Sequence, residues 1–96
     1  MRLVNLVIAN TGTISNSIEV IGIDQITIYG PAALTGVVSI EVDPGDGNFI
    51  DTTLDIIADG LTRLVPVHGN FVRLVSTLAE GAERTFPVHG STLVIS

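Results

Sequence analysis

The sequence predicts an all-β protein, a single small antiparallel β-sandwich of the jelly-roll-like or Ig-like kind, with eight or nine short strands over residues 1–96. Apolar and polar residues alternate with a period of two, which is typical of strands that bury one face. β-branched residues fill most of these runs. Turn signals separate the runs at the short spacing found in sandwiches and barrels.

Three runs in the first third of the chain show this alternation. They are RLVNLVIAN at residues 2–10, SIEVIGI at 17–23 and DQITIY at 24–29. Side chains two residues apart on a strand share a face, so one set in each run is expected to point into the core. The expected inward residues are Val4, Leu6, Ile8, Ile18, Val20, Ile26 and Ile28.

The clearest hairpin follows the run TGVVSIEVD. It is expected to join residues 36–43 to a strand near 48–57 across the turn Pro44-Gly45-Asp46-Gly47. Acidic and amide side chains at residues 43–51 suggest a calcium loop, but proline and glycine stand where an EF-hand needs ligands, and the distal glutamate is missing. A solvated hairpin tip is predicted, and ion binding at the Asp43–Asp51 turn is left open.

A repeat marks the second half of the chain. RLVPVHGNFVRLV begins at residue 63, and RTFPVHGSTLVIS begins 21 residues later. The repeat is interpreted as two similar hairpins, in which His-Gly forms the turn and Gly69 and Gly90 adopt positive φ. The prolines are expected at strand ends, because proline cannot donate to a β-ladder. Between the two copies, STLAEGAER is the stretch that could form a helical turn.

His68 and His89 are the histidines of this repeat and the chain contains no others. A zinc site needs three or four ligands, and without cysteine the remaining ligands would be carboxylates such as Glu80 or Glu83. The spacing does not require these groups to converge, so no metal and no other cofactor is predicted. No Gly-x-Ser-x-Gly elbow and no phosphate loop occurs, and no catalytic residue is predicted.

Composition narrows the class of partner. The chain has ten acidic residues, four arginines, no lysine and a net charge of −6. This balance argues against nucleic acid and against an anionic membrane. Hydrophobic residues make up 46% of the chain and charged residues 15%, whereas domains average about 25% charged. We therefore expect apolar side chains on the surface, another protein that covers them, and a homo-oligomer. No apolar run approaches the ~20 residues of a membrane span, and synthesis in the cytoplasm is expected.

A protein-interface patch is expected on the first strands. If one parity of residues 2–10 and 17–23 faces the core, the other parity faces outward. On this basis the predicted interface residues are Leu3, Val7, Ile21 and Ile23.

Two segments carry a resemblance to a known class. ALTGVVSIEVDPGDGNF at residues 33–49 and FVRLVSTLAEGAERTFPVHG at 71–90 resemble small virion structural proteins of tailed bacteriophages, over about half of the chain. The resemblance implies a β-sandwich or jelly-roll-like module that sits on a capsid shell as decoration or cement, or that belongs to the tail and its fibres. It carries no active-site residues.

The expected function is therefore that of a non-enzymatic structural protein of a phage virion, most of all a capsid decoration or cement protein that binds and stabilises the shell. Its partner would be the major capsid protein or another virion protein, and its location the virion, assembled in the host cytoplasm. The alternative is a tail, fibre or adhesin-type module that binds a host glycan or protein, and a small hydrolase is the third class considered.

Overall fold

Strands form the regular structure of this protein. The computed structural model describes residues 1–92, and within them nine short strands occur and no helix. The prediction of an all-β fold built like a small sandwich is confirmed. The strands are β1 (Leu6–Ile8), β2 (Ile18–Glu19), β3 (Gln25–Tyr29), β4 (Val38–Asp43), β5 (Ile50–Asp55), β6 (Leu61–Leu64), β7 (Phe71–Ser76), β8 (Arg84–Phe86) and β9 (Val88–Ser91).

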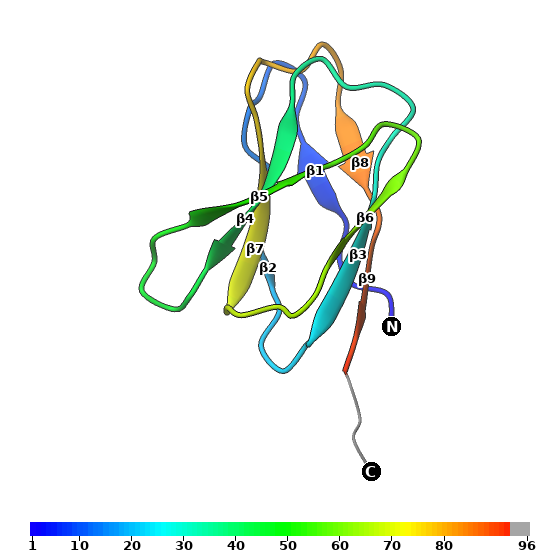
Figure 1. The fold of residues 1–96 in the computed structure, drawn as a ribbon. Coiled ribbons are helices and arrows are strands. Elements are labelled where there is room, and N and C mark those ends of the chain that lie inside the picture. Colours follow the sequence, from blue (N-terminus) through cyan, green and yellow to red (C-terminus); the bar gives the residue numbers. More distant parts are fainter. Residues whose placement is uncertain (93–96) are drawn as a thin grey trace.

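Every strand pair among the described residues is antiparallel. One sheet has four strands in the order β2-β7-β4-β5, a second has three in the order β6-β3-β9, and β1 pairs with β8. Figure 1 shows β3, β6 and β9 on one side of the molecule and β2, β4 and β7 on the other, with β1 and β8 between them at one end. Consequently β5 and β6 are edge strands of their two sheets.

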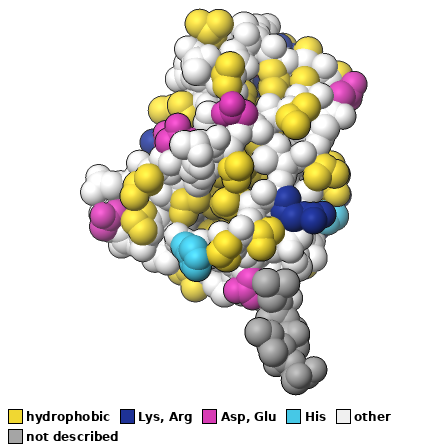
Figure 2. Space-filling model, viewed as in Figure 1, with side chains coloured by type: hydrophobic (Ala, Val, Ile, Leu, Met, Phe, Trp, Pro, Cys, Tyr) yellow, Lys and Arg dark blue, Asp and Glu magenta, His cyan; other side chains and the backbone are white. Residues whose placement is uncertain are grey.

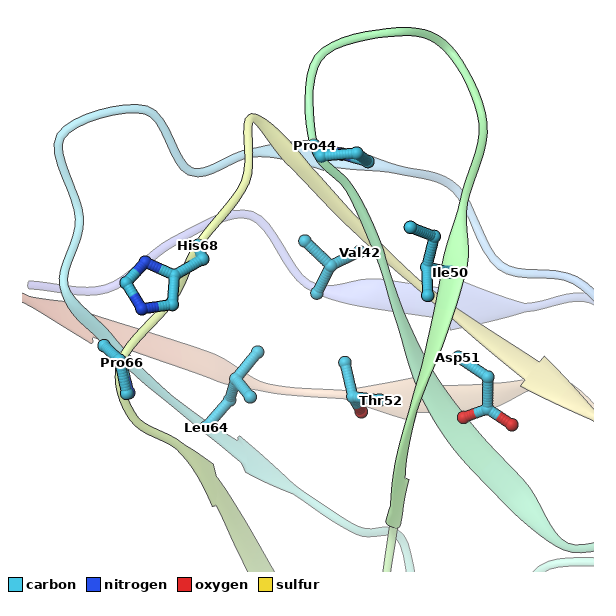
Figure 3. A pocket seen from close by; sticks show the side chains of 8 residues that line it. All are labelled: Val42, Pro44, Ile50, Asp51, Thr52, Leu64, Pro66 and His68. Carbon is cyan, nitrogen blue, oxygen red and sulfur yellow. The ribbon is translucent and has the colours of Figure 1, made fainter.

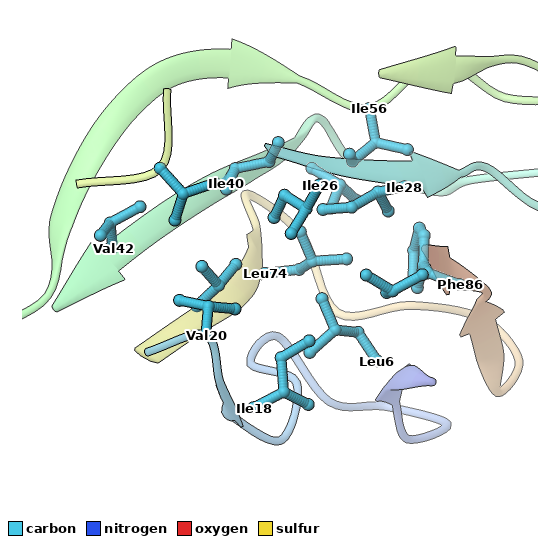
Figure 4. Packing of buried hydrophobic residues seen from close by; sticks show 14 of the residues in the cluster. Leu6, Ile18, Val20, Ile26, Ile28, Ile40, Val42, Ile56, Leu74 and Phe86 are labelled. Carbon is cyan, nitrogen blue, oxygen red and sulfur yellow. The ribbon is translucent and has the colours of Figure 1, made fainter. Parts of the chain in front are cut away.

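The core lies between these sheets and follows the predicted alternation within each strand. Ile26 and Ile28 of β3 face Ile40 of β4 and Leu74 of β7, and all four are fully buried (Figure 4). Phe86 of β8 closes one end of this cluster. Burying each such side chain contributes roughly 1.5 to 3 kcal/mol, so the inward faces are the main source of stability.

The predicted alternation is wrong outside the strand bounds. Val4 was expected in the core but is 70% exposed, because β1 begins only at Leu6. Ile23 was expected outside but is buried, since the N–H of Ile23 donates to the carbonyl of Val20 in a turn. That turn contains Gly22, with φ of 81°, and it returns the chain to the core. The alternation of inward and outward residues along 17–20 therefore does not continue to Ile23.

The two Pro-Val-His-Gly segments are not hairpin turns. The first lies in the connection from β6 to β7 and so carries the chain from the three-stranded to the four-stranded sheet. In the second, Pro87 separates β8 from β9, and His89 and Gly90 lie within β9. Both copies are places where the chain changes sheet. Residues 93–96, which end the second predicted hairpin, lie outside the described residues.

The glycines of these segments lie in close packing and do not have positive φ. Neither Gly69 nor Gly90 is among the residues with positive φ. A Cβ at Gly69 would overlap Cγ1 of Val42 and would lie 2.8 Å from the carbonyl oxygen of Asp43. At Gly90 it would lie 3.1 Å from side chains of the core. Gly69 therefore excludes a side chain, whereas at Gly90 the side chains of Ile23 and Leu3 would have to shift by a few tenths of an ångström.

The predicted hairpin is present as β4 and β5. Asp43 organises its turn, because its Oδ1 accepts the N–H groups of Gly45 (2.7 Å) and Gly47 (3.1 Å). Gly45 and Gly47 both have positive φ. The acidic residue at the end of β4 thus acts as a local cap for the turn.

A bulge in β5 bends this hairpin. Ser39 pairs with Asp55 and Glu41 with Asp51, so residues 52–54 of β5 stand opposite Ile40 alone. Thr53 has φ of 65°, and the hydroxyl of Thr52 donates to the carbonyl of Ile40 (2.8 Å) in place of a ladder bond. Bulges bend and twist a strand. In Figure 1 the tip of the hairpin accordingly projects away from the rest of the molecule.

The stretch STLAEGAER begins at the last residue of β7 and ends at the first residue of β8, and the residues between form a loop without a helical turn. Its Glu80 folds back into the protein, where it binds residues of the loop before β4 and Arg84. No helix long and apolar enough to cross a bilayer occurs over the part of the chain that the structure describes.

Candidate protein-binding hollow

The edge strands β5 and β6 lie closest at one end and separate toward the hairpin tip. At the close end, the hydroxyl of Thr62 donates to the carbonyl of Asp55 (3.0 Å). Farther along, the bulged β5 follows the projecting hairpin, whereas β6 continues into the connection to β7. The two sheets are therefore open to solvent along this side.

A hollow of about 270 Å³ lies in this opening between β5 and β6. β4 and the hairpin supply one wall, and β6 with the connection after it supplies the other (Figure 3). Leu64 and Thr52 point toward the space between these walls, whereas the carboxylate of Asp51 points away. The lining residues are Val42, Pro44, Ile50, Asp51, Thr52, Leu64, Pro66 and His68.

Large apolar side chains also stand exposed on both edge strands. Ile50 of β5 lines the hollow and is 59% exposed, whereas Leu61 of β6, 49% exposed, pairs with Tyr29 and faces the outer side of the three-stranded sheet. Figure 2 shows hydrophobic side chains gathered in a recess on this face, with a histidine at its lower rim. Such a concave apolar surface can accept an aliphatic or aromatic side chain of another molecule.

The two histidines lie in different surroundings. His68 lines the hollow, whereas the ring of His89 on β9 packs edge-on against Tyr29 of β3, with centroids 5.7 Å apart. Within residues 1–92, no group of three or more histidine, cysteine or acidic side chains is arranged to hold a metal ion. Glu80, one carboxylate considered with the histidines, is bonded elsewhere, and Glu83 is exposed.

Glu80 is the carboxylate most strongly shaped by its environment. Burial alone would raise the pKa of Glu80, but N–H groups of Thr35 and Gly36, the hydroxyl of Ser76 and the guanidinium of Arg84 all donate to the carboxylate and together lower the pKa to about 2. The carboxylate therefore stays ionised, with its lone pairs occupied by the fold. This arrangement stabilises structure and leaves no free position for a reacting group.

A second ion pair lies on the outer face of the four-stranded sheet. Nε of Arg73 donates to Oε1 of Glu41 at 2.9 Å, and the guanidinium carbon of Arg73 lies 4.0 Å from the ring centre of Phe49. These contacts fix the residues next to the hairpin and hold Phe49 against β7.

The four predicted interface residues do not form one exposed patch. Ile21 is 58% exposed, whereas Ile23 is buried, and Leu3 packs against the core. Val7 is half-buried on β1, which pairs with β8, whereas β2 pairs with β7. The first two strands are therefore not neighbours, and the structure does not bring their outward residues together.

Sequence reasoning missed the hollow because its walls come from segments far apart in the chain. Residues 43–51 were assigned to a solvated hairpin tip, and His68-Gly69 to the turn of a separate hairpin. The repeat did single out Pro66 and His68 and so supplied one signal. Nothing in the local pattern indicated that the β4–β5 hairpin would lie across from them.

No protein-family model, no curated protein and no solved structure matches this chain. Support for a function therefore comes from the hollow, from the composition, and from the resemblance carried by residues 33–49 and 71–90.

Proposed function

We propose that this chain is a non-enzymatic structural protein of a phage virion, a decoration or cement protein that binds a capsid shell through the apolar hollow between β5 and β6. The observation that supports this proposal most is the hollow itself, an opening of about 270 Å³ between two sheet edges that is lined by the exposed Ile50. Exposed sheet edges are normally protected from other chains, so an edge lined in this way fits a binding surface.

Two further features support the proposal. The chain is 46% hydrophobic and only 15% charged, as expected when another protein surface covers part of a small domain. In addition, the carboxylates of Glu80, Asp43 and Glu41 are held by hydrogen bonds or by arginine, which gives them structural roles. On a symmetric shell, many weak copies of such a contact would act together by bridging neighbouring subunits.

Electron microscopy of purified particles tests the class of protein. A decoration protein is present in many copies over the shell. A chain found sparsely on the tail would instead indicate the fibre or adhesin alternative, and absence from particles would overturn both.

Substitution in the hollow tests the surface. Ile50→Asp places a charge at the hollow on a side chain that is 59% exposed, so the domain should stay folded but lose binding to emptied shells in a sedimentation assay. Leu78→Asp is the matched control, since Leu78 is 57% exposed on a different loop. Equal binding by the two folded variants would remove the hollow from the proposal.

A further inference from the structure

The arginines of this acidic chain divide into two groups. Arg73 pairs with Glu41, and Arg84 pairs with Glu80. The other two, Arg2 and Arg63, are exposed, and over residues 1–92 neither takes part in an ion pair.

Both of these arginines stand in one row across the three-stranded sheet. Thr27 of β3 pairs with Arg63 of β6 on one side and with His89 of β9 on the other, and His89 pairs with Arg2. Directly paired residues project from the same face of a sheet. Ile26 and Ile28 on either side of Thr27 are buried, so this face is the outer one. We call Arg63, Thr27, His89 and Arg2 the arginine row.

Apolar side chains lie beside the arginine row on the same face. Leu61 pairs with Tyr29, and both side chains are exposed, at 49% and 39%. The ring of Tyr29 also contacts His89. The face therefore combines positive charge with apolar contact area, as protein interfaces do.

The outer face of the opposite sheet is acidic. Asp51 and Asp55 of β5 pair with Glu41 and Ser39 of β4, and Glu19 lies on β2. Asp51 accepts the N–H of Thr53, and Asp55 accepts the hydroxyl of Ser39. Neither carboxylate is in an ion pair with any residue from 1 to 92. The sandwich thus presents opposite charge on its two outer faces.

We propose that copies of this chain associate head to tail, with the arginine row of one copy against Asp51 and Asp55 of the next. Arg63 and Arg2 are three strand spacings apart, which is about 14 Å, and Asp51 and Asp55 are four residues apart along β5, which is at most about 13 Å. Two arginines can therefore meet two aspartates at once. A second copy and a nucleic acid are both negatively charged overall, but only the copy offers two carboxylates spaced like the two arginines of the row, so it fits this face better. This contact does not depend on the shell-binding proposal.

Sedimentation velocity of the full chain tests the contact without any particle. The chain should associate more as its concentration rises, and less when salt is raised from about 20 to about 500 mM. Two double variants, Arg2→Glu with Arg63→Glu and Asp51→Arg with Asp55→Arg, should each associate at least about tenfold more weakly. Circular dichroism checks that each is folded, and Arg2→Gln with Arg63→Gln replaces the first variant if it is not.

Mixing the two charge-reversed variants is the decisive measurement. Each alone carries one sign of charge on both faces, but the mixture brings opposite faces together and should restore association. Glu83→Arg, on an exposed loop away from both faces, should associate like the parent. A parent that stays monomeric at about 1 mM and low salt, or a mixture that stays monomeric while the parent associates, would overturn the proposal.

Discussion

Among residues 1–92, Glu80 is the buried side chain that makes the most hydrogen bonds, and its replacement by glutamine removes the charge. Oε1 accepts the N–H of Thr35 (2.9 Å) and Nε of Arg84 (2.9 Å), and Oε2 accepts the N–H of Gly36 (3.0 Å) and the hydroxyl of Ser76 (2.8 Å). The Glu80 side chain has no exposed surface. Glutamine keeps the shape but offers one oxygen, so at least one backbone N–H loses its acceptor.

The size of the effect follows from the pKa. Burial opposes ionisation of Glu80, but the hydrogen bonds outweigh it and lower the pKa from 4.5 to about 2. That difference corresponds to about 3 kcal/mol of stability for the charged form. An unpaired buried N–H alone costs about 1 to 3 kcal/mol. We therefore expect Glu80→Gln to destabilise the protein by about 3 kcal/mol at neutral pH, which lowers Tm by roughly 12 to 24 °C.

Thermal unfolding followed by circular dichroism over a range of pH tests the cause. Because the pKa of Glu80 is lower in the folded than in the unfolded chain, its stabilising effect is complete above about pH 4.5 and is lost as pH falls to about 2. The difference in Tm between the parent and Glu80→Gln should shrink over that window. Glu83→Gln on the same loop is the control and should unfold like the parent. A difference in Tm that persists unchanged at pH 2, or none at neutral pH, would refute the electrostatic explanation.

Two further substitutions test the packing around the hollow. Gly69→Ala should lower the free energy of unfolding by at least about 2 kcal/mol, because its Cβ would overlap Val42. Gly81→Ala is the control and should change stability little, since the nearest atom to its Cβ would lie at an ordinary 3.5 Å. Equal midpoints of urea unfolding for the two variants would contradict this account. Asp43→Ala should cost about 1 to 3 kcal/mol and should speed amide hydrogen exchange at Gly45 and Gly47, and unchanged exchange there would show that the side chain does not hold the turn.

The alternation of apolar residues was enough to predict the fold class and the inward side chains of most strands. Ile26, Ile28 and Ile40 were placed correctly because the two-residue period depends only on neighbours in the chain. The hairpin from β4 to β5 was also predicted, since Pro44-Gly45-Asp46-Gly47 is a turn signal in itself. These features depend on local geometry, so short segments of the sequence are enough to predict them.

Only the tertiary structure decided which strands lie side by side, and with them every candidate site. The turn before Ile23 interrupts the alternation from which an exposed patch was predicted, and β1 and β2 pair with different strands. Glu80 binds Thr35, 45 residues away, and the hollow joins residues near 50 to residues near 66. The pairing of Arg2 with His89 across the chain likewise created the arginine row. Such contacts depend on how the nine short strands of residues 1–92 pair. Many pairings satisfy the same local alternation, so the sequence pattern alone does not select among them.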